Sequence, residues 1–118
     1  MSRRRHRVPA KPAHLIRSAP LFAALGDETR LYIVARLSAG RPMSIVRLAA
    51  GTGVTRQAVT KHLHVLSGAG LVCSHRAGRE SVWELEPEPL RAAQRSLARI
   101  SAQWDEALDR LKRFVEEG

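Results

Sequence analysis

The chain has 118 residues, of which 44% are hydrophobic, and it carries a formal net charge of +9 at pH 7. This length suffices for one domain with a modest core, and the apolar content excludes a disordered chain. No apolar run approaches the roughly 18 residues of a membrane-spanning helix, and no apolar stretch follows the charged start as in a secretory signal. We therefore expect a cytoplasmic globular protein with no cofactor and no membrane contact.

The charge is unevenly distributed along the chain. Residues 1–26 and 29–79 contain Lys and Arg but no acidic residue, whereas residues 84–118 hold most of the acids. A domain that gathers cations in this way attracts a polyanion, which favours nucleic acid as the partner. A generic basic surface is the alternative interpretation.

The first segments are a basic arm and a short helix. Residues 1–13 are basic and contain two prolines, which is typical of a flexible arm. A first helix is expected over residues 19–25, with Ser18 as its N-cap and Pro20 in its first turn. The arginines of the arm could follow a nucleic-acid backbone, or the arm could be a tail with only a weak electrostatic role.

Two further helices are predicted from their caps. Asp27 can cap a second helix that closes at Gly40, and Ser44 can cap a short third helix. Gly51 and Gly53 follow the third helix and are expected to end it. A glycine-bearing turn then leads to the next helix.

The segment 54–66, "VTRQAVTKHLHVL", predicts an amphipathic helix capped by Thr55. Val59, Leu63 and Leu66 fall within about 60° of one another and should form its buried face. His62 lies beside that face, where we expect a hydrogen bond to backbone, with a phosphate contact as the alternative. The polar side has no acid and carries Arg56, Gln57, Thr60, Lys61 and His64.

A hairpin should follow the turn at residues 67–70. The β-prone runs 71–75 and 81–85 flank a loop with Gly78 at the turn. Arg76 and Arg79 flank its tip, where they could reach phosphates or an adjacent minor groove. Solvent exposure alone is the alternative.

The prolines after residue 86 start a long helix that carries a heptad pattern. Its apolar residues recur at alternating steps of three and four, as in a coiled coil. A lone helix would leave this stripe in water, so we expect it to pack on the first helix and on the same helices of a second chain. The predicted dimer contacts are Leu97, Ile100, Trp104 and Leu111.

A short helix joined through a glycine-bearing turn to a second helix is a helix-turn-helix, whose second helix enters the DNA major groove. Gln57 can pair with adenine, and Arg56 or Lys61 can donate to guanine. The absence of an acid fits this role because an acid would repel phosphate. The predicted DNA-contacting residues are Thr55, Arg56, Gln57, Thr60, Lys61, His64, Arg76 and Arg79.

Three segments carry a family resemblance: "LFAALGDETRLYIVARL", "VTRQAVTKHLHVLSGAGLV" and "RAGRESVWEL". Over about residues 19–85 the chain resembles the ArsR/SmtB family of winged-helix bacterial repressors. The resemblance implies a homodimer that binds a palindromic operator and usually represses. The tail with "QWDEALDRLKRFVEE" is similar to the branch of autorepressors without a metal site.

The chain departs from the metal sensors of that family. Those sensors place a Cys-x-Cys pair in the helix before the recognition helix, or His and Asp on the last helix. Here "SIVRLAAG" has no cysteine and residues 87–118 have no histidine. Cys73 and His75 share one strand face, but two ligands do not complete a tetrahedral site, so we predict no metal. The remaining ligand candidates are Cys73, His75, His6 and His14.

The predicted fold is mainly α, with a winged helix-turn-helix domain over residues 14–86 and a dimerisation helix over 87–118 in the same structural domain. The predicted function is a homodimeric repressor that binds double-stranded DNA through helix 55–69 and the wing 71–85. An enzyme is not expected, because no paired acids, phosphate loop or nucleophile–base pair is evident. The alternatives are a metal- or thiol-responsive repressor using Cys73 and His75, and a winged-helix module for protein or RNA.

Overall fold

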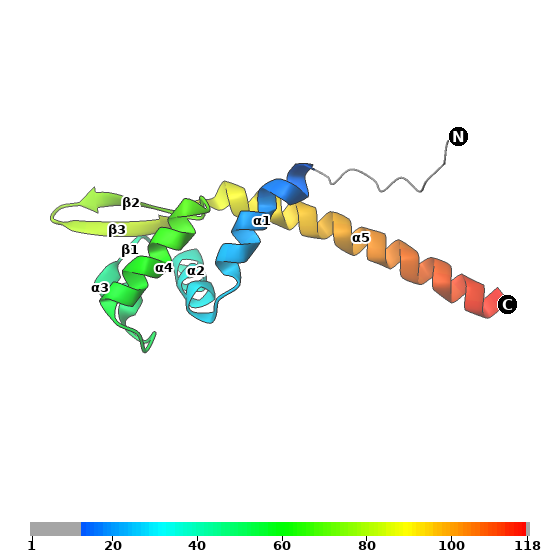
Figure 1. Ribbon diagram of the computed structural model, residues 1–118, viewed down its shortest axis with the longest axis horizontal. Helices are drawn as coiled ribbons and strands as arrows, with labels where there is room; N and C mark the ends of the chain where they lie inside the picture. Colours follow the sequence, from blue (N-terminus) through cyan, green and yellow to red (C-terminus); the bar gives the residue numbers. More distant parts are fainter. Residues whose placement is uncertain (1–12, 118) are drawn as a thin grey trace, which may run out of the picture.

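A computed structural model describes residues 13–117, with side chains from residue 16 onward. Four helices and a hairpin gather at one end of the molecule, and a fifth helix projects from them as a long rod (Figure 1). This mainly helical, winged arrangement with a long last helix confirms the predicted fold class. In chain order the elements are α1 (Ala13–Leu25), α2 (Glu28–Ala39), β1 (Met43–Ser44), α3 (Ile45–Ala49), α4 (Arg56–Gly68), β2 (Val72–Ala77), β3 (Glu80–Leu85) and α5 (Pro87–Glu117).

Three of the predicted helix caps are present. The side chains of Asp27, Ser44 and Thr55 each accept a hydrogen bond from the backbone N–H three residues further on, at 3.0, 3.3 and 3.1 Å. Each bond satisfies a donor that the first turn of a helix leaves unpaired. Gly51 and Gly53, with φ of 83° and 77°, follow α3 in a conformation that suits glycine.

The prediction for the first helix was wrong at its start. α1 begins at Ala13 rather than at residue 19, so Ser18 is a buried residue within the helix and not its N-cap. Pro20 also lies inside the helix, where it cannot donate a backbone bond and costs about 3 kcal/mol. Burial of the face formed by Ser18, Leu21 and Ala24, on a helix that packs along α5, offsets this cost.

The three strands form an antiparallel sheet in the order β1-β3-β2. β1, where Met43 pairs with Trp83, was not predicted, because two residues are too few to show an alternating pattern. The hairpin strands are longer than predicted, since Ala77 pairs with Glu80 and only two residues remain for the turn. Gly78 begins that turn with φ of 67°, as a type II′ turn requires.

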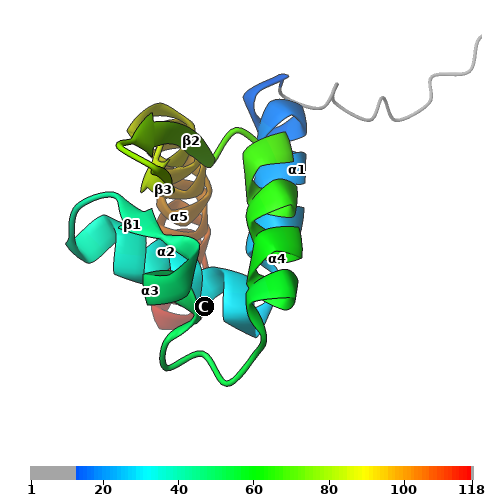
Figure 2. The ribbon, with the colours of Figure 1, turned by 90° about the vertical axis from the view of Figure 1, so that its left-hand side faces the viewer.

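The core lies where α4 packs against α1, α2 and α3 (Figure 2). Val59, Leu63 and Leu66 are fully buried, which confirms the predicted inner face of α4. Ile33 from α2 and Leu48 from α3 are also fully buried. The polar side of α4 is therefore held outward by a core drawn from all four helices.

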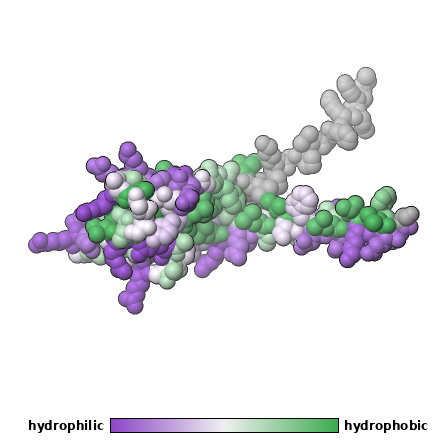
Figure 3. Space-filling view, turned by 90° about the horizontal axis from the view of Figure 1, so that it is seen from below, coloured by the Kyte–Doolittle hydropathy of each residue, from purple (hydrophilic) through white to green (hydrophobic). Residues whose placement is uncertain are grey.

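α5 extends far beyond this core. The radius of gyration is 20.3 Å, whereas a compact chain of this length has about 13 Å. Past residue 100 every described side chain on α5 is exposed except the half-buried Ala107. Apolar side chains run along one side of the rod and polar ones along the other (Figure 3). The large apolar residues left exposed on α5 are Leu97, Trp104, Leu108, Leu111, Phe114 and Val115.

Candidate nucleic-acid interface

α4 presents the predicted polar face at the surface of the molecule. Arg56, Gln57, Lys61 and His64 are all exposed, and Thr60 is half-buried. No acidic side chain occurs on α4. The structure therefore brings Gln57, Thr60, Lys61 and His64 together on the side of α4 away from its buried side. Arg56 lies between the two sides, at the start of the helix.

The two threonines have unequal bonding capacity. Thr55 accepts the capping bond from the N–H of Ala58, so its own hydroxyl proton remains available to donate to a phosphate. Thr60 donates its proton to the carbonyl oxygen of Arg56 at 2.9 Å. Thr60 can then only accept a hydrogen bond or offer its methyl group, which narrows the role predicted for it.

The hairpin places its two arginines differently. Arg76 lies four residues after Val72 on β2, so both side chains are on the same face of the hairpin. That face also carries the buried Trp83 of β3. The Trp83 ring lies 6.2 Å from the ring of His64, so that face borders α4. Arg79 stands in the turn itself, and both arginines are exposed.

Arg30 and Arg36, for which the sequence predicted no individual role, form hydrogen bonds within the fold. Arg36 donates from Nη1 to the carbonyl oxygens of Arg47 and Ala50, at 2.9 and 3.0 Å, and so caps the end of α3. Arg30 donates from Nε to the carbonyl oxygen of Ala24. These bonds position the helices around α4.

His62 has different partners from those predicted. Its Nδ1 lies 3.2 Å from Nη1 of Arg30 and 3.8 Å from Oδ2 of Asp27, so it contacts side chains rather than backbone. The hydrogen bond from the backbone N–H of Arg30 lowers the pKa of Asp27, the positive charge of Arg30 lowers it further, and desolvation opposes them. The Asp-x-Thr-Arg motif supplies two members of this cluster, but nothing local indicates that they meet His62.

Cys73 and His75 lie on the opposite face of the hairpin from Trp83. The Cys73 thiol donates to Oε1 of Glu86 at 3.1 Å, and this bond, with partial burial and the charges of Glu86 and Glu84, raises the pKa of the thiol. His75 instead lies 3.4 Å from Oε1 of Glu84. Among residues 16–117 no three His, Cys, Asp or Glu side chains are grouped so as to hold a metal ion.

Some predicted features lie outside the described residues. The basic arm is one of them, apart from Ala13, and so are His6 and the side chain of His14. The predicted domain boundaries remain predictions. No helix of the described chain has the length and apolar character needed to cross a membrane.

The fold and its exposed, acid-free helix define the class: a winged helix-turn-helix DNA-binding domain. Residues 25–74 match the family model of a helix-turn-helix domain. The HTH-type transcriptional regulator Rv2034 of Mycobacterium tuberculosis is 40% identical over 95 residues, covering 80% of this chain and 85% of that protein. The chain belongs to the ArsR family of transcriptional regulators.

Solved structures agree with this assignment. An ArsR-like transcriptional regulator from Rhodococcus sp. RHA1 superposes with a TM-score of 0.71 at 39% identity, covering 85% of this chain and 93% of that one. A homodimeric winged helix-turn-helix domain from Mycobacterium bovis, a possible ArsR-family regulator, has a TM-score of 0.61 at 25% identity, covering 86% and 94%. The protein is therefore a DNA-binding regulator and not an enzyme.

Proposed function

We propose that this regulator is a homodimeric repressor that binds a palindromic operator, acts in the cytoplasm and does not respond to metal ions. The observation that carries the proposal is the outward face of α4, which exposes Arg56, Gln57 and Lys61 on a helix whose other side is fully buried. Side chains so presented can enter a major groove while the core holds their positions.

Within the proposal, base reading and backbone binding fall to different residues. Gln57 can hydrogen-bond both edge groups of adenine, and Arg56 or Lys61 can donate to the two acceptors of guanine. Thr55 can donate its hydroxyl proton to a phosphate, whereas Thr60 can offer a base its methyl group or accept from a base amino group. His64 lies beside the wing. Arg76 and Arg79 of the wing would contact the flanking backbone or minor groove.

The exposed stripe of α5 supports a homodimer. Leu97, Trp104 and Leu111 are 51%, 63% and 58% exposed, and Ile100 is half-buried. Side chains of this size gain about 1.5–3 kcal/mol each on full burial, so a second α5 is a favourable cover. The Mycobacterium bovis relative is a homodimer. To read successive major grooves of a palindrome, two α4 helices must lie about 34 Å apart, and a two-fold axis through α5 would allow this spacing.

The hairpin geometry supports the absence of metal control. A metal ion binds the thiolate of cysteine, whereas the bond to Glu86 raises the pKa of the Cys73 thiol and so favours its protonated form. Nδ1 of His75 lies beside the carboxylate of Glu84, whereas the Cys73 thiol is bonded to Glu86. We therefore propose control through protein abundance by autorepression or through a non-metal effector.

Nuclease protection of the region upstream of the protein's own coding sequence tests the proposal. We expect two protected half-sites related by two-fold symmetry, with centres one DNA turn apart. Titration of the complex with zinc, nickel, cadmium and arsenite should not release it. Protection of a single half-site would contradict the dimer, and release by micromolar metal that is lost in Cys73→Ser would contradict the absence of metal control.

A further inference from the structure

A pocket of about 310 Å³ lies between α1, α5 and the turn that follows α4, away from the proposed DNA-binding face. Three arginines line it: Arg17 from α1, and Arg95 and Arg99 from α5. No acidic residue lines it. Nη2 of Arg95 lies 4.0 Å from Glu88, but both side chains are well exposed, so this ion pair is weak. The walls therefore favour a negatively charged occupant.

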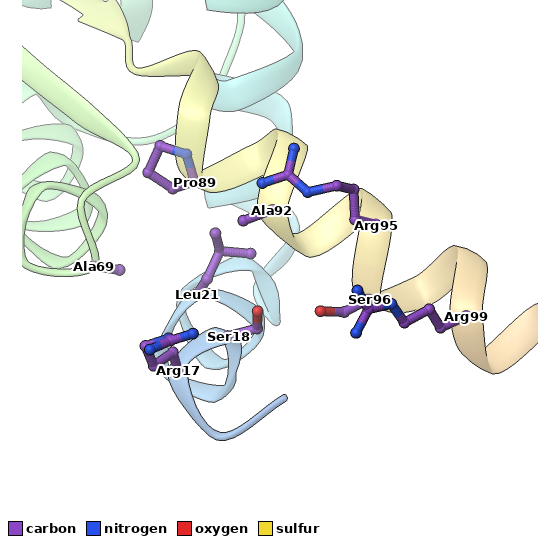
Figure 4. A pocket seen from close by; sticks show the side chains of 9 residues that line it. All are labelled: Arg17, Ser18, Leu21, Ala69, Pro89, Ala92, Arg95, Ser96 and Arg99. Atoms are coloured by element: carbon purple, nitrogen blue, oxygen red, sulfur yellow. The ribbon is translucent and has the colours of Figure 1, made fainter. Parts of the chain in front are cut away.

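Two buried serines face each other across this pocket (Figure 4). Ser18 is 7% exposed and Ser96 is 1% exposed. The Ser96 hydroxyl has no hydrogen-bond partner among the described residues. A buried hydroxyl without a partner is unfavourable, and such groups are rare in native proteins. A ligand oxygen in the pocket would satisfy it.

Apolar atoms complete the pocket. Leu21 of α1, Pro89 and Ala92 of α5, and Ala69 after α4 line the remaining wall (Figure 4). The volume is at the small end of the range for ligand pockets, about 300–1,000 Å³. A charged head beside the arginines and serines, with a short apolar body against this wall, matches the lining.

The pocket and the proposed dimer contact occupy different sides of α5. At about 100° per residue, the positions of Ala92, Arg95, Ser96 and Arg99 lie on average about 130° around the helix from the exposed Trp104. A second chain packed along the stripe would therefore leave the pocket side of α5 to α1. The pocket is thus compatible with a dimer.

From the arginines, the unpaired Ser96 hydroxyl and the apolar wall, we infer that this pocket binds a small organic anion, a carboxylate or phosphate monoester, as an effector of operator binding. The effector role rests on the proposed function. Its structural basis is Ala69, which caps the C-terminal end of α4 by donating its N–H to Leu66. A ligand held between Ala69 and α5 contacts the ends of both the recognition helix and the dimer helix. Its binding free energy can therefore differ between the DNA-bound and the DNA-free arrangement of these two helices.

Binding is tested on the full chain by calorimetric titration with hexanoate and hexyl phosphate. 1-Hexanol and hexylamine serve as uncharged and cationic controls, and inorganic phosphate serves as an anion without an apolar chain. We expect saturable binding of the two organic anions and none of the controls except weak binding of phosphate. The tighter of the two anions identifies the preferred head group. Equal binding of hexanol, or of phosphate and hexyl phosphate, would overturn the inference.

Variants locate the site. Ser96→Ala removes an unpaired hydroxyl, so it should not lower the thermal unfolding temperature, yet it should weaken anion binding about threefold or more. Arg95→Gln should weaken it about tenfold or more, because a charged hydrogen bond is lost. Arg91→Gln makes the same charge change one turn away, outside the pocket, and should bind as the parent does. Parent-like binding by both pocket variants would contradict the site.

The effector role has a separate measurement. The operator affinity of the parent is first measured without any anion. If the parent does not bind the operator, the proposed function is wrong, but the test of anion binding in the pocket still holds. Saturating hexanoate or hexyl phosphate should then change the operator Kd by about fivefold or more, and Ser96→Ala should reduce that change at a fixed anion concentration. An unchanged operator Kd with the pocket occupied would overturn the effector role.

Discussion

Arg30 on α2 joins the recognition helix through His62, with Nη1 of the guanidinium 3.2 Å from Nδ1 of the imidazole. The same guanidinium donates through Nε to the carbonyl oxygen of Ala24 at the end of α1. One side chain therefore bonds to α1 and α4 from its place on α2. Because an arginine is always charged and only donates, Nδ1 of His62 accepts in this contact.

Replacing Arg30 should destabilise the domain. Arg30→Met keeps much of the aliphatic length but removes both contacts, and we expect a loss of about 1–3 kcal/mol in the free energy of unfolding. Chemical denaturation followed by circular dichroism measures it. Arg41→Met, at an exposed arginine with no side-chain hydrogen bond seen in the described structure, is the matched control. Equal stability of the two variants would contradict the positioning role of Arg30.

Asp27 should make stability fall in acid. Its pKa is lowered in the folded state, chiefly by the bond from the N–H of Arg30, so it contributes stability above the unfolded value of about 3.9. That contribution is lost as the pH falls through the folded pKa. Asp27→Asn can still cap α2 but has no charge, so its deficit relative to the parent should be present at pH 7 and shrink below about pH 4. A deficit that does not change between pH 7 and pH 3 would contradict this.

Cys73 should be a slow nucleophile. Its raised pKa lowers the fraction of thiolate, which is the reactive form. Glu86→Ala removes the largest cause of that rise, so alkylation by iodoacetamide at pH 8 should accelerate, and the midpoint of its pH profile should move down. Glu80→Ala removes an exposed acid elsewhere on the hairpin and serves as the control. No acceleration in Glu86→Ala would show that the carboxylate does not hold the thiol.

Local sequence signals predicted much of the fold. Asp27, Ser44 and Thr55 were identified as caps because a cap depends on a bond only three residues away. The outer face of α4 followed from helical periodicity alone. The start of α1 did not, because burial of Ser18 against the distant α5 overrides the local signal at Pro20.

Long-range pairings set the limit on what the sequence could show of the candidate sites. Arg30 and His62 are 32 residues apart, and no local pattern indicates their contact. Ser18 and Ser96 meet across the pocket only because α1 packs on α5. Cys73 lies at partial exposure on the outer hairpin face, because β2 turns its alternate residues away from the core.

The exposed stripe of α5 should hold the dimer together. Trp104→Asp combined with Leu111→Asp places two charges in the stripe, so we expect monomers by sedimentation at micromolar concentration and loss of operator binding. The core packs elsewhere, so cooperative thermal unfolding should persist. Ala102→Asp adds an exposed acid on the opposite side of α5 and should remain a dimer. A parent protein that sediments as a stable monomer would contradict the assembly.

Operator affinity measured beside affinity for a random duplex tests the role of α4 most directly. Gln57→Ala and Lys61→Ala should each weaken operator binding by about 1–3 kcal/mol, and Gln57→Ala should leave random-duplex binding nearly unchanged. Arg79→Ala should weaken binding to both duplexes and reduce the salt slope by about one. Gln94→Ala, at an exposed glutamine of α5, is the control and should match the parent. If Gln57→Ala, Lys61→Ala and Arg79→Ala all bind the operator as tightly as the parent, the outer face of α4 and the wing do not read DNA.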